Sequence, residues 1–210
     1  MEYFVYKIED CEKAFGIDKS LSRPKQISLL AKQQLLSIIK EKGLSFDTTI
    51  AVGEKGKPYF LYNENLHFSI SHTKSHIAIA LDNQPIGIDI EQKRRYKPDL
   101  VRRFFHSDEV AYLSALPIEE QDEVFTRIWT LKEAFVKYTG QGIADNFKSF
   151  AVGLPLQSSE TDFVQAKLSF DSIVPNAGNV QSSISAFSIK DCEHQLYIAI
   201  CKREFLLIKP

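Results

Sequence analysis

The sequence has little sulfur and no long apolar stretch. Its 210 residues include one methionine and three cysteines, Cys11, Cys192 and Cys201. The cysteines lie far apart and lack the close spacing of a metal site, so we expect free thiols in a reducing compartment. No apolar run approaches the roughly 18 residues that a membrane span needs, and the N-terminal segment MEYFVYKIED lacks the apolar core of a secretory signal. The sequence therefore predicts a cytoplasmic protein.

An excess of charge of one sign is also lacking. The chain has 26 Lys and Arg residues against 27 Asp and Glu residues, and its formal net charge is −1. Such a balance gives no general attraction to nucleic acid or to an anionic membrane, so we expect neither as a partner. Any anion-binding site must come from a local cluster. With 44% hydrophobic residues, the chain can build a sizeable core.

Strand and helix patterns divide the chain into two halves. In the first half, Ser22 and Pro24 predict the start of a helix and Gly43 its end. The strands expected in this half are residues 3–8, 48–52, 67–71 and 76–81, and a further strand at residues 86–91 is expected where the two halves meet. In the second half we expect helices at residues 98–105, from Ser107 onward and at 119–138, and strands at 147–152, 163–170, 184–189 and 196–201. We therefore predict an α+β fold with two related halves, residues 1–86 and 87–210.

The strand expected after Pro85 carries two acids on one face. Because side chains alternate along a strand, Gly87, Asp89 and Glu91 share one face and three isoleucines share the other. Two close like charges repel unless a cation lies between them, and Mg²⁺ prefers carboxylate oxygens. We expect these acids to be exposed without metal, and Gly87 to leave room for a ligand. On this segment alone, an edge strand with two solvated acids is the simpler interpretation.

The helix expected at residues 119–138 adds a third acid. Trp129, Glu133 and Lys137 are four residues apart and share one face. A metal that holds a diphosphate needs acids for the ion and a cation for the remaining phosphate charge. The alternative is an ordinary surface pair of Glu133 and Lys137, worth a few tenths of a kcal/mol, about 0.2–0.5.

Basic and hydroxyl side chains supply the candidate anion site. Lys57 lies in a Gly-Lys-Pro turn, and Ser71 and His72 end a strand, where a hydroxyl and a ring N–H suit phosphate oxygens. Arg23 and Lys25 add two cations at the start of a helix. The alternative for His72 is a surface or structural histidine.

Three segments together resemble a known family. Phe68–His72, Pro85–Glu91 and Trp129–Lys137 are similar, in order and spacing, to the three signature blocks of the 4′-phosphopantetheinyl transferase superfamily. The resemblance covers roughly residues 57–150. The length and the two halves resemble the larger, monomeric type of this superfamily, whose halves are related by pseudo-two-fold symmetry. The resemblance therefore implies that fold and a monomer.

The resemblance implies a role for each matched residue at the metal and the diphosphate. Asp89, Glu91 and Glu133 would bind Mg²⁺. Lys137 would contact the diphosphate of coenzyme A, and Lys132 would face it too. These are implications of the family pattern, which the residues by themselves leave open.

The family pattern also implies contacts for the adenosine end of coenzyme A. Lys57, Ser71 and His72 would hold the 3′-phosphate and the neighbouring phosphates. Basic residues of the first helix would reach the same phosphate, and Arg23 and Lys25 compete for that role with Lys32.

The implied reaction transfers the 4′-phosphopantetheine arm of coenzyme A to a serine of an apo acyl or peptidyl carrier protein. The serine would attack the β-phosphorus, and adenosine 3′,5′-bisphosphate would leave. The base would be Glu133 or a metal-bound water that it orients. The alternative from another class is a non-catalytic module that binds coenzyme A or a carrier protein, although such a module needs no metal triad.

A basic segment follows the second signature block. Residues 93–97 and 102–105 mix lysine and arginine with aromatic side chains, which suits an acidic, partly apolar partner such as a carrier domain. The alternative is a solvated basic helix face.

Overall fold

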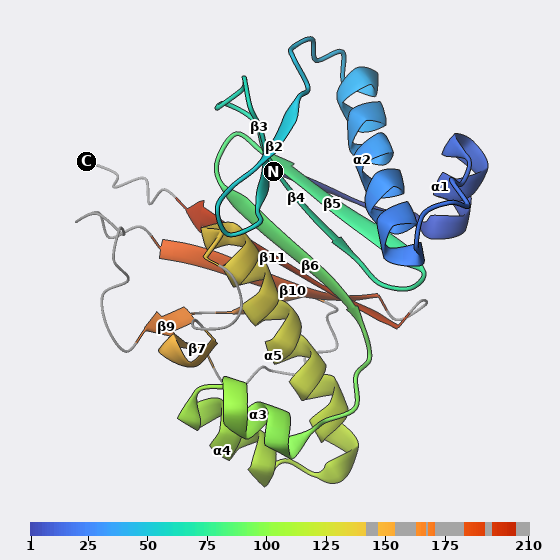
Figure 1. The fold of residues 1–210 in the computed structure, drawn as a ribbon. Coiled ribbons are helices and arrows are strands. Elements are labelled where there is room, and N and C mark those ends of the chain that lie inside the picture. Colours follow the sequence, from blue (N-terminus) through green and yellow to red (C-terminus); the bar gives the residue numbers. More distant parts are fainter. Residues whose placement is uncertain (142–146, 154–162, 167, 171–182, 192–194, 205–210) are drawn as a thin grey trace, which may run out of the picture.

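The computed structural model describes residues 1–141, 147–153, 163–166, 168–170, 183–191 and 195–204 (Figure 1). The first half contains β1 (Glu2–Lys7), α1 (Ile8–Phe15), α2 (Arg23–Glu41), β2 (Ile50–Val52), β3 (Pro58–Phe60), β4 (His67–His72) and β5 (His76–Asp82). The expected helix after Ser22 is confirmed, with Ser22 as its N-cap and a proline in its first turn. Helix α1 was not expected.

The first sheet has the order β1-β5-β4, and all its pairs are antiparallel. Helix α2 covers one face of this sheet (Figure 1). Its buried Leu30, Leu35 and Ile38 belong to one apolar cluster with Ile77 and Ile79 of β5. The sequence folds this way because apolar residues follow helical spacing in α2, and because large apolar residues alternate with alanines in the fully buried strand β5.

The second half contains β6 (Ile86–Gln92), α3 (Pro98–Phe104), α4 (Ser107–Ala115), α5 (Ile118–Thr139), the 3₁₀ turn η1 (Phe147–Ser149), β7 (Phe150–Val152), β8 (Phe163–Ala166), β9 (Leu168–Phe170), β10 (Ser183–Asp191) and β11 (Leu196–Glu204). Its main sheet has the order β6-β11-β10-β8, and β7 pairs with β9. Helix α5 ends at Gly140, as expected, in the left-handed conformation. Helix α4 begins at Ser107, as expected, and His106 is its N-cap and forms a capping box with Glu109.

The two sheets meet through their remaining faces. Ala78 and Ala80 of β5 pack in one buried cluster with Ile86, Ile88 and Ile90 of β6, together with apolar residues of β11. At the sheet edges, the Ser69 hydroxyl of β4 accepts a hydrogen bond of 3.0 Å from the backbone N–H of Ile88. This bond satisfies an edge N–H that the β6-β11 ladder does not use, and it ties β4 to β6.

Two expectations from the sequence concern free cysteines and the lack of a membrane span. Cys11 and Cys201 are buried free thiols, as expected, whereas Cys192 lies outside the described residues. In the part of the chain that the structure describes, no helix combines the length and apolar character that crossing a bilayer would require.

Gly87 of β6 lies directly beneath helix α5. A Cβ at this position would stand 2.0 Å from the Ala134 carbonyl oxygen and 2.3 Å from the Tyr138 backbone nitrogen. Both are backbone atoms, which cannot move aside as the end of a side chain can. The glycine therefore admits the helix, and the expectation that it makes room for a ligand is wrong.

Replacing Gly87 by alanine is expected to destabilise the protein strongly, because the added methyl group forces α5 away from β6. We expect a loss of about 3 kcal/mol or more in the free energy of unfolding, measured by urea denaturation. Gly53→Ala is the matched control, since its added Cβ would meet only the Lys57 carbonyl oxygen at 3.4 Å. Equal stability of the two variants would contradict the close approach.

Candidate active site

Three acids gather where β6 faces helix α5. Asp89 and Glu91 extend from β6 and Glu133 from α5. Asp89 is 4% exposed and Glu133 is 8% exposed, and only Glu91 is partly accessible. The expectation of exposed acids is therefore wrong for Asp89 and Glu133, because α5 packs on the acidic face of β6 and covers both.

The two oxygens of Asp89 have different surroundings. Its Oδ1 accepts hydrogen bonds of 2.7 Å from the Ser71 hydroxyl and 2.7 Å from the Lys137 ammonium. The Lys137 ammonium also donates to the Ser71 hydroxyl at 2.7 Å, which closes a ring of three groups. Its Oδ2 is buried and has no hydrogen-bond partner among the described residues. A buried carboxylate oxygen without a donor favours a cation at that point.

The pKa values of the two glutamates are raised. Burial is the main cause that raises the pKa of Glu133 to about 7, and the charge of Asp89 adds to it, while Lys137 opposes it. The pKa of Glu91 is also raised, first by burial and then by Asp89, against the opposing charge of Arg94. Bringing these acids together without a second cation therefore destabilises their charged forms.

A divalent metal fits this donor set. The described residues contain no group of three or more His, Cys, Asp and Glu side chains already arranged around a common point. Even so, the oxygen-only donors, the unpartnered Oδ2 of Asp89 and the mutual repulsion of Asp89, Glu91 and Glu133 match what a hard cation such as Mg²⁺ requires.

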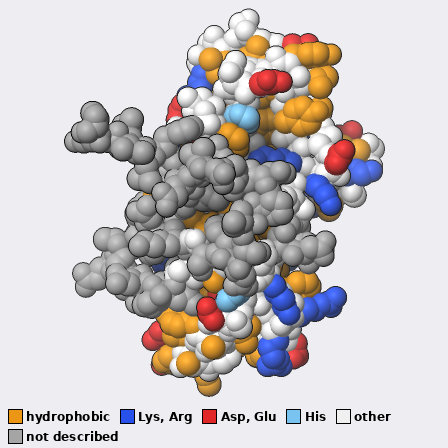
Figure 2. Space-filling view, turned by 90° about the vertical axis from the view of Figure 1, so that its left-hand side faces the viewer, with side chains coloured by type: hydrophobic (Ala, Val, Ile, Leu, Met, Phe, Trp, Pro, Cys, Tyr) orange, Lys and Arg blue, Asp and Glu red, His pale blue; other side chains and the backbone are white. Residues whose placement is uncertain are grey.

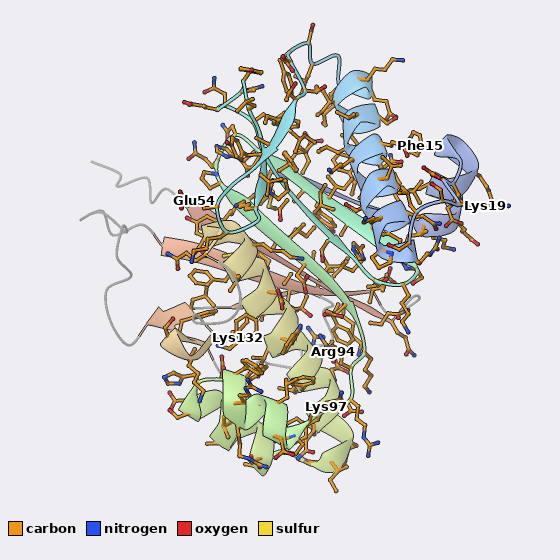
Figure 3. The ribbon with its side chains drawn as sticks, in the orientation of Figure 1. Phe15, Lys19, Glu54, Arg94, Lys97 and Lys132 are labelled. Carbon is orange, nitrogen blue, oxygen red and sulfur yellow. The ribbon has the colours of Figure 1, made fainter. Side chains whose placement is uncertain are left out.

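Lys132 does not face the acids. It is fully buried, its ammonium lies 3.0 Å from a carboxylate oxygen of Glu109 in α4, and it donates to the carbonyl oxygens of Phe147 and Phe150. Burial lowers its pKa to about 8. The expected contact of Lys132 with a diphosphate is wrong, because neighbouring residues of a helix point about 100° apart and Lys132 points toward α4 and β7 (Figure 3).

Lys57 also forms its hydrogen bonds within the protein. Its ammonium donates to the carbonyl oxygens of Ile86 at 3.1 Å and of Tyr138 at 2.9 Å. Burial lowers its pKa to about 8. Lys57 thus joins its turn to the start of β6 and to the end of α5, a structural role in place of the expected phosphate contact.

The remaining anion candidates lie apart from this ring. His72 is exposed and points to the opposite side of β4 from Ser71, with its Nδ1 3.4 Å from the Thr73 carbonyl oxygen. Arg23 pairs with Glu12 of α1, and Lys25 is exposed at the start of α2. The structure therefore brings Ser71 and Lys137 to the acids and leaves the other basic candidates outside.

Arg94 belongs to the site, although sequence reasoning placed it in the basic segment. Its guanidinium donates to Glu91 at 2.9 Å and lies 4.4 Å from the centre of the Trp129 ring. The signal was present in the sequence, since Arg94 follows Glu91 by three residues and Trp129 precedes Glu133 by one helical turn.

Comparisons with known proteins point to one family. A family model described as the 4′-phosphopantetheinyl transferase superfamily matches residues 85–175. A 4′-phosphopantetheinyl transferase of Bacillus subtilis is 39% identical over 112 residues, which is 53% of this chain and 48% of that protein. The 4′-phosphopantetheinyl transferase Sfp of Bacillus subtilis (strain 168) is 37% identical over 108 residues, 51% of this chain and 48% of that protein.

A relative from a different organism aligns with a slightly larger share of this chain. The 4′-phosphopantetheinyl transferase AcpT of Escherichia coli O157:H7 is 38% identical over 120 residues, 56% of this chain and 60% of that protein. The chain spans about half the length of the curated relatives that it matches first. The residues of the acidic cluster all lie within the stretch that the family model matches.

Replacing Glu133 by glutamine is expected to stabilise the metal-free protein at pH 8 but not at pH 5. The folded state binds the Glu133 proton more tightly than the unfolded chain, so the free energy of unfolding falls as the pH rises from about 4.5 through about 7. A shift of this size corresponds to at most about 3 kcal/mol.

Denaturant titrations in a chelator across this pH range measure the effect. Glu119→Gln, an exposed glutamate of the same helix, is the matched control. Parallel pH curves for Glu133→Gln and the unmodified protein would show that Glu133 carries no raised pKa.

Proposed function

We propose, from the match of residues 85–175 to the family model of the 4′-phosphopantetheinyl transferase superfamily, that this chain transfers the phosphopantetheine arm of coenzyme A to a serine of an apo acyl or peptidyl carrier protein. The observation that carries the proposal is the buried acidic cluster with an unpartnered Asp89 Oδ2 beside Lys137. A module that only binds coenzyme A has no need to bring three repelling acids together and to bury two of them.

Asp89, Glu91 and Glu133 are the proposed holders of Mg²⁺. When bound, Mg²⁺ neutralises charge on the diphosphate and so favours displacement at phosphorus. Lys137 lies at the same point and supplies a second cation, which we assign to the diphosphate and its leaving oxygen.

The proposed step forms a bond between the carrier serine oxygen and the β-phosphorus of coenzyme A, and breaks the bond from that phosphorus to the departing adenosine 3′,5′-bisphosphate. Glu133, or a metal-bound water that it orients, would accept the serine proton. The chain itself supplies no nucleophile in this scheme.

His72, Arg23 and Lys25 remain the proposed contacts of the adenosine 3′-phosphate. All three are exposed, so their donors are accessible to a ligand from solvent. Arg23 would exchange its pairing with Glu12 for a phosphate, which carries more charge.

We also propose that residues 1–86 and 87–210 form two halves related by pseudo-two-fold symmetry. A helix covers one face of a sheet in each half, α2 on the first sheet and α5 on the second (Figure 1). The proposed assembly state is a monomer, in the cytoplasm, where the buried thiols of Cys11 and Cys201 suit a reducing environment.

Incubation with coenzyme A, Mg²⁺ and an apo carrier tests the function. Mass spectrometry should show the added arm on the carrier serine, and Asp89→Asn should lower the rate by about a hundredfold or more, as loss of a group that stabilises transition-state charge does. The matched control is Glu54→Gln, an exposed acid of the first half (Figure 3). Binding of coenzyme A without transfer to any carrier in a panel would favour the binding module instead.

The proposed carrier-binding surface contains fewer residues than the basic segment identified in the sequence. Tyr96 and Phe105 pack into the core, and Arg94 pairs with Glu91, whereas the remaining cations of the segment are exposed. These are Lys93, Arg95, Lys97, Arg102 and Arg103. Figure 2 shows Lys and Arg side chains gathered at the height of α3 and α4 on the face that it displays. A cavity of about 590 Å³ beside them is lined by Arg102, Phe105 and Lys148, among others.

Reversal of charge at Arg95 and Arg102 to glutamate is expected to raise KM for the carrier and to leave KM for coenzyme A unchanged. Such surface charges mainly speed the encounter with an acidic partner, so the effect should shrink as salt is added. Steady-state kinetics at low and high salt measure it, with Lys40→Glu on α2 as control. An unchanged carrier KM at low salt removes this surface from the docking site.

A further inference from the structure

The Ser71 hydroxyl uses its single proton in a hydrogen bond to Asp89. The hydroxyl donates to Asp89 Oδ1 and accepts from the Lys137 ammonium, both at 2.7 Å. The side chain is 6% exposed and points from β4 toward β6. A serine hydroxyl has one proton to donate, and here that proton goes to Asp89. None is left for a phosphate oxygen, which accepts but does not donate at neutral pH.

Of the two carboxylate oxygens of Asp89, only one lacks a hydrogen-bond partner among the described residues. Two donors hold Oδ1, while Oδ2 is buried and has no partner among the described residues. Turning the carboxylate out of this orientation would break both hydrogen bonds. The donors therefore fix the carboxylate with Oδ2 directed away from Ser71, as second partners of metal ligands do.

Lys137 cannot provide this orientation alone once substrate is present. In the proposed reaction its ammonium turns to the diphosphate, which weakens its hold on Oδ1. Ser71 then remains as the described donor that keeps Asp89 in place. The serine comes from β4, the edge strand of the other sheet, so the first half of the chain orients a ligand that the second half supplies.

We propose that Ser71 is a positioning residue for the metal site, which holds Asp89 Oδ1 so that Oδ2 faces the cation, and that it is not a phosphate contact. The proposal rests on the metal site of the proposed function. It differs from the role that the family resemblance gave to Ser71, and it predicts that removing the hydroxyl weakens the metal and spares the adenosine end of coenzyme A.

The test measures metal and coenzyme A binding separately on the full chain. Mn²⁺ is the metal probe, and its dissociation constant is determined from the free-ion electron paramagnetic resonance signal, with and without saturating coenzyme A. Ser71→Ala should weaken Mn²⁺ binding about tenfold or more, the range seen for outer partners of metal ligands. The affinity for coenzyme A in a chelator should not change. Ser71→Thr, which keeps a hydroxyl, should restore most of the Mn²⁺ affinity.

Ser69→Ala is the matched control. Ser69 lies two residues earlier on the same face of β4, is equally buried, and accepts from the Ile88 N–H next to Asp89. Its loss should lower the melting temperature and leave Mn²⁺ affinity unchanged. Equal weakening of Mn²⁺ by both serine variants would show a merely structural role and overturn the proposal.

Three further results also overturn it. The first is an unchanged Mn²⁺ affinity in Ser71→Ala, and the second is no Mn²⁺ binding by the unmodified protein in either condition. The third is a loss of coenzyme A affinity of Ser71→Ala in the chelator, which would make Ser71 a phosphate contact. If Ser71→Ala weakens Mn²⁺ as expected but no carrier is modified by the unmodified protein, the positioning role stands and the proposed transfer fails.

Discussion

The close approach of helix α5 to strand β6 is the constraint on which the site depends. Side chains normally separate a helix from the sheet that it covers, but at Gly87 the backbone of α5 rests against the strand. Two residues further along β6, the same contact brings Asp89 under the helix, beside Lys137 and the charge of Glu133. A side chain at Gly87 would separate the acids from the lysine without touching any of them.

Buried lysines hold the same helix at two other points. Lys132 ties α5 to Glu109 of α4 and to the backbone around β7, and Lys57 ties its C-terminal end to the turn before β3. Burying an ammonium group is unfavourable unless its donors are satisfied. Here carbonyl oxygens and one carboxylate satisfy them, so these charges fix the position of α5. The sequence predicted similar phosphate-binding roles for Lys57, Lys132 and Lys137. In the structure, Lys57 and Lys132 have structural roles, and only Lys137 lies at the acidic cluster.

Short sequence patterns predicted the helices and strands well, but they predicted the side-chain contacts between these elements poorly. Ser22, Pro24 and Gly140 marked helix ends correctly because capping and left-handed conformation depend on neighbouring residues. Alternation placed Asp89 and Glu91 on one face, again a local property. The orientation of Lys132 depends on Glu109, 23 positions earlier, and the partner of Ser71 is 18 positions away. Such pairings follow from how two sheets and a helix pack, which no short segment encodes.

Cys201 lies opposite Gly87 in the β6-β11 ladder, under the same helix. It is fully buried, and burial raises the pKa of its thiol while the nearby Lys57 opposes the shift. A protonated, inaccessible thiol does not react with alkylating reagents. Alkylation of Cys201 then requires α5 to lift from the sheet, and where closing is faster than the reagent, the rate reports the equilibrium of that opening. Alkylation of Cys201 therefore measures how stably α5, the helix that completes the acidic cluster, packs on the sheet.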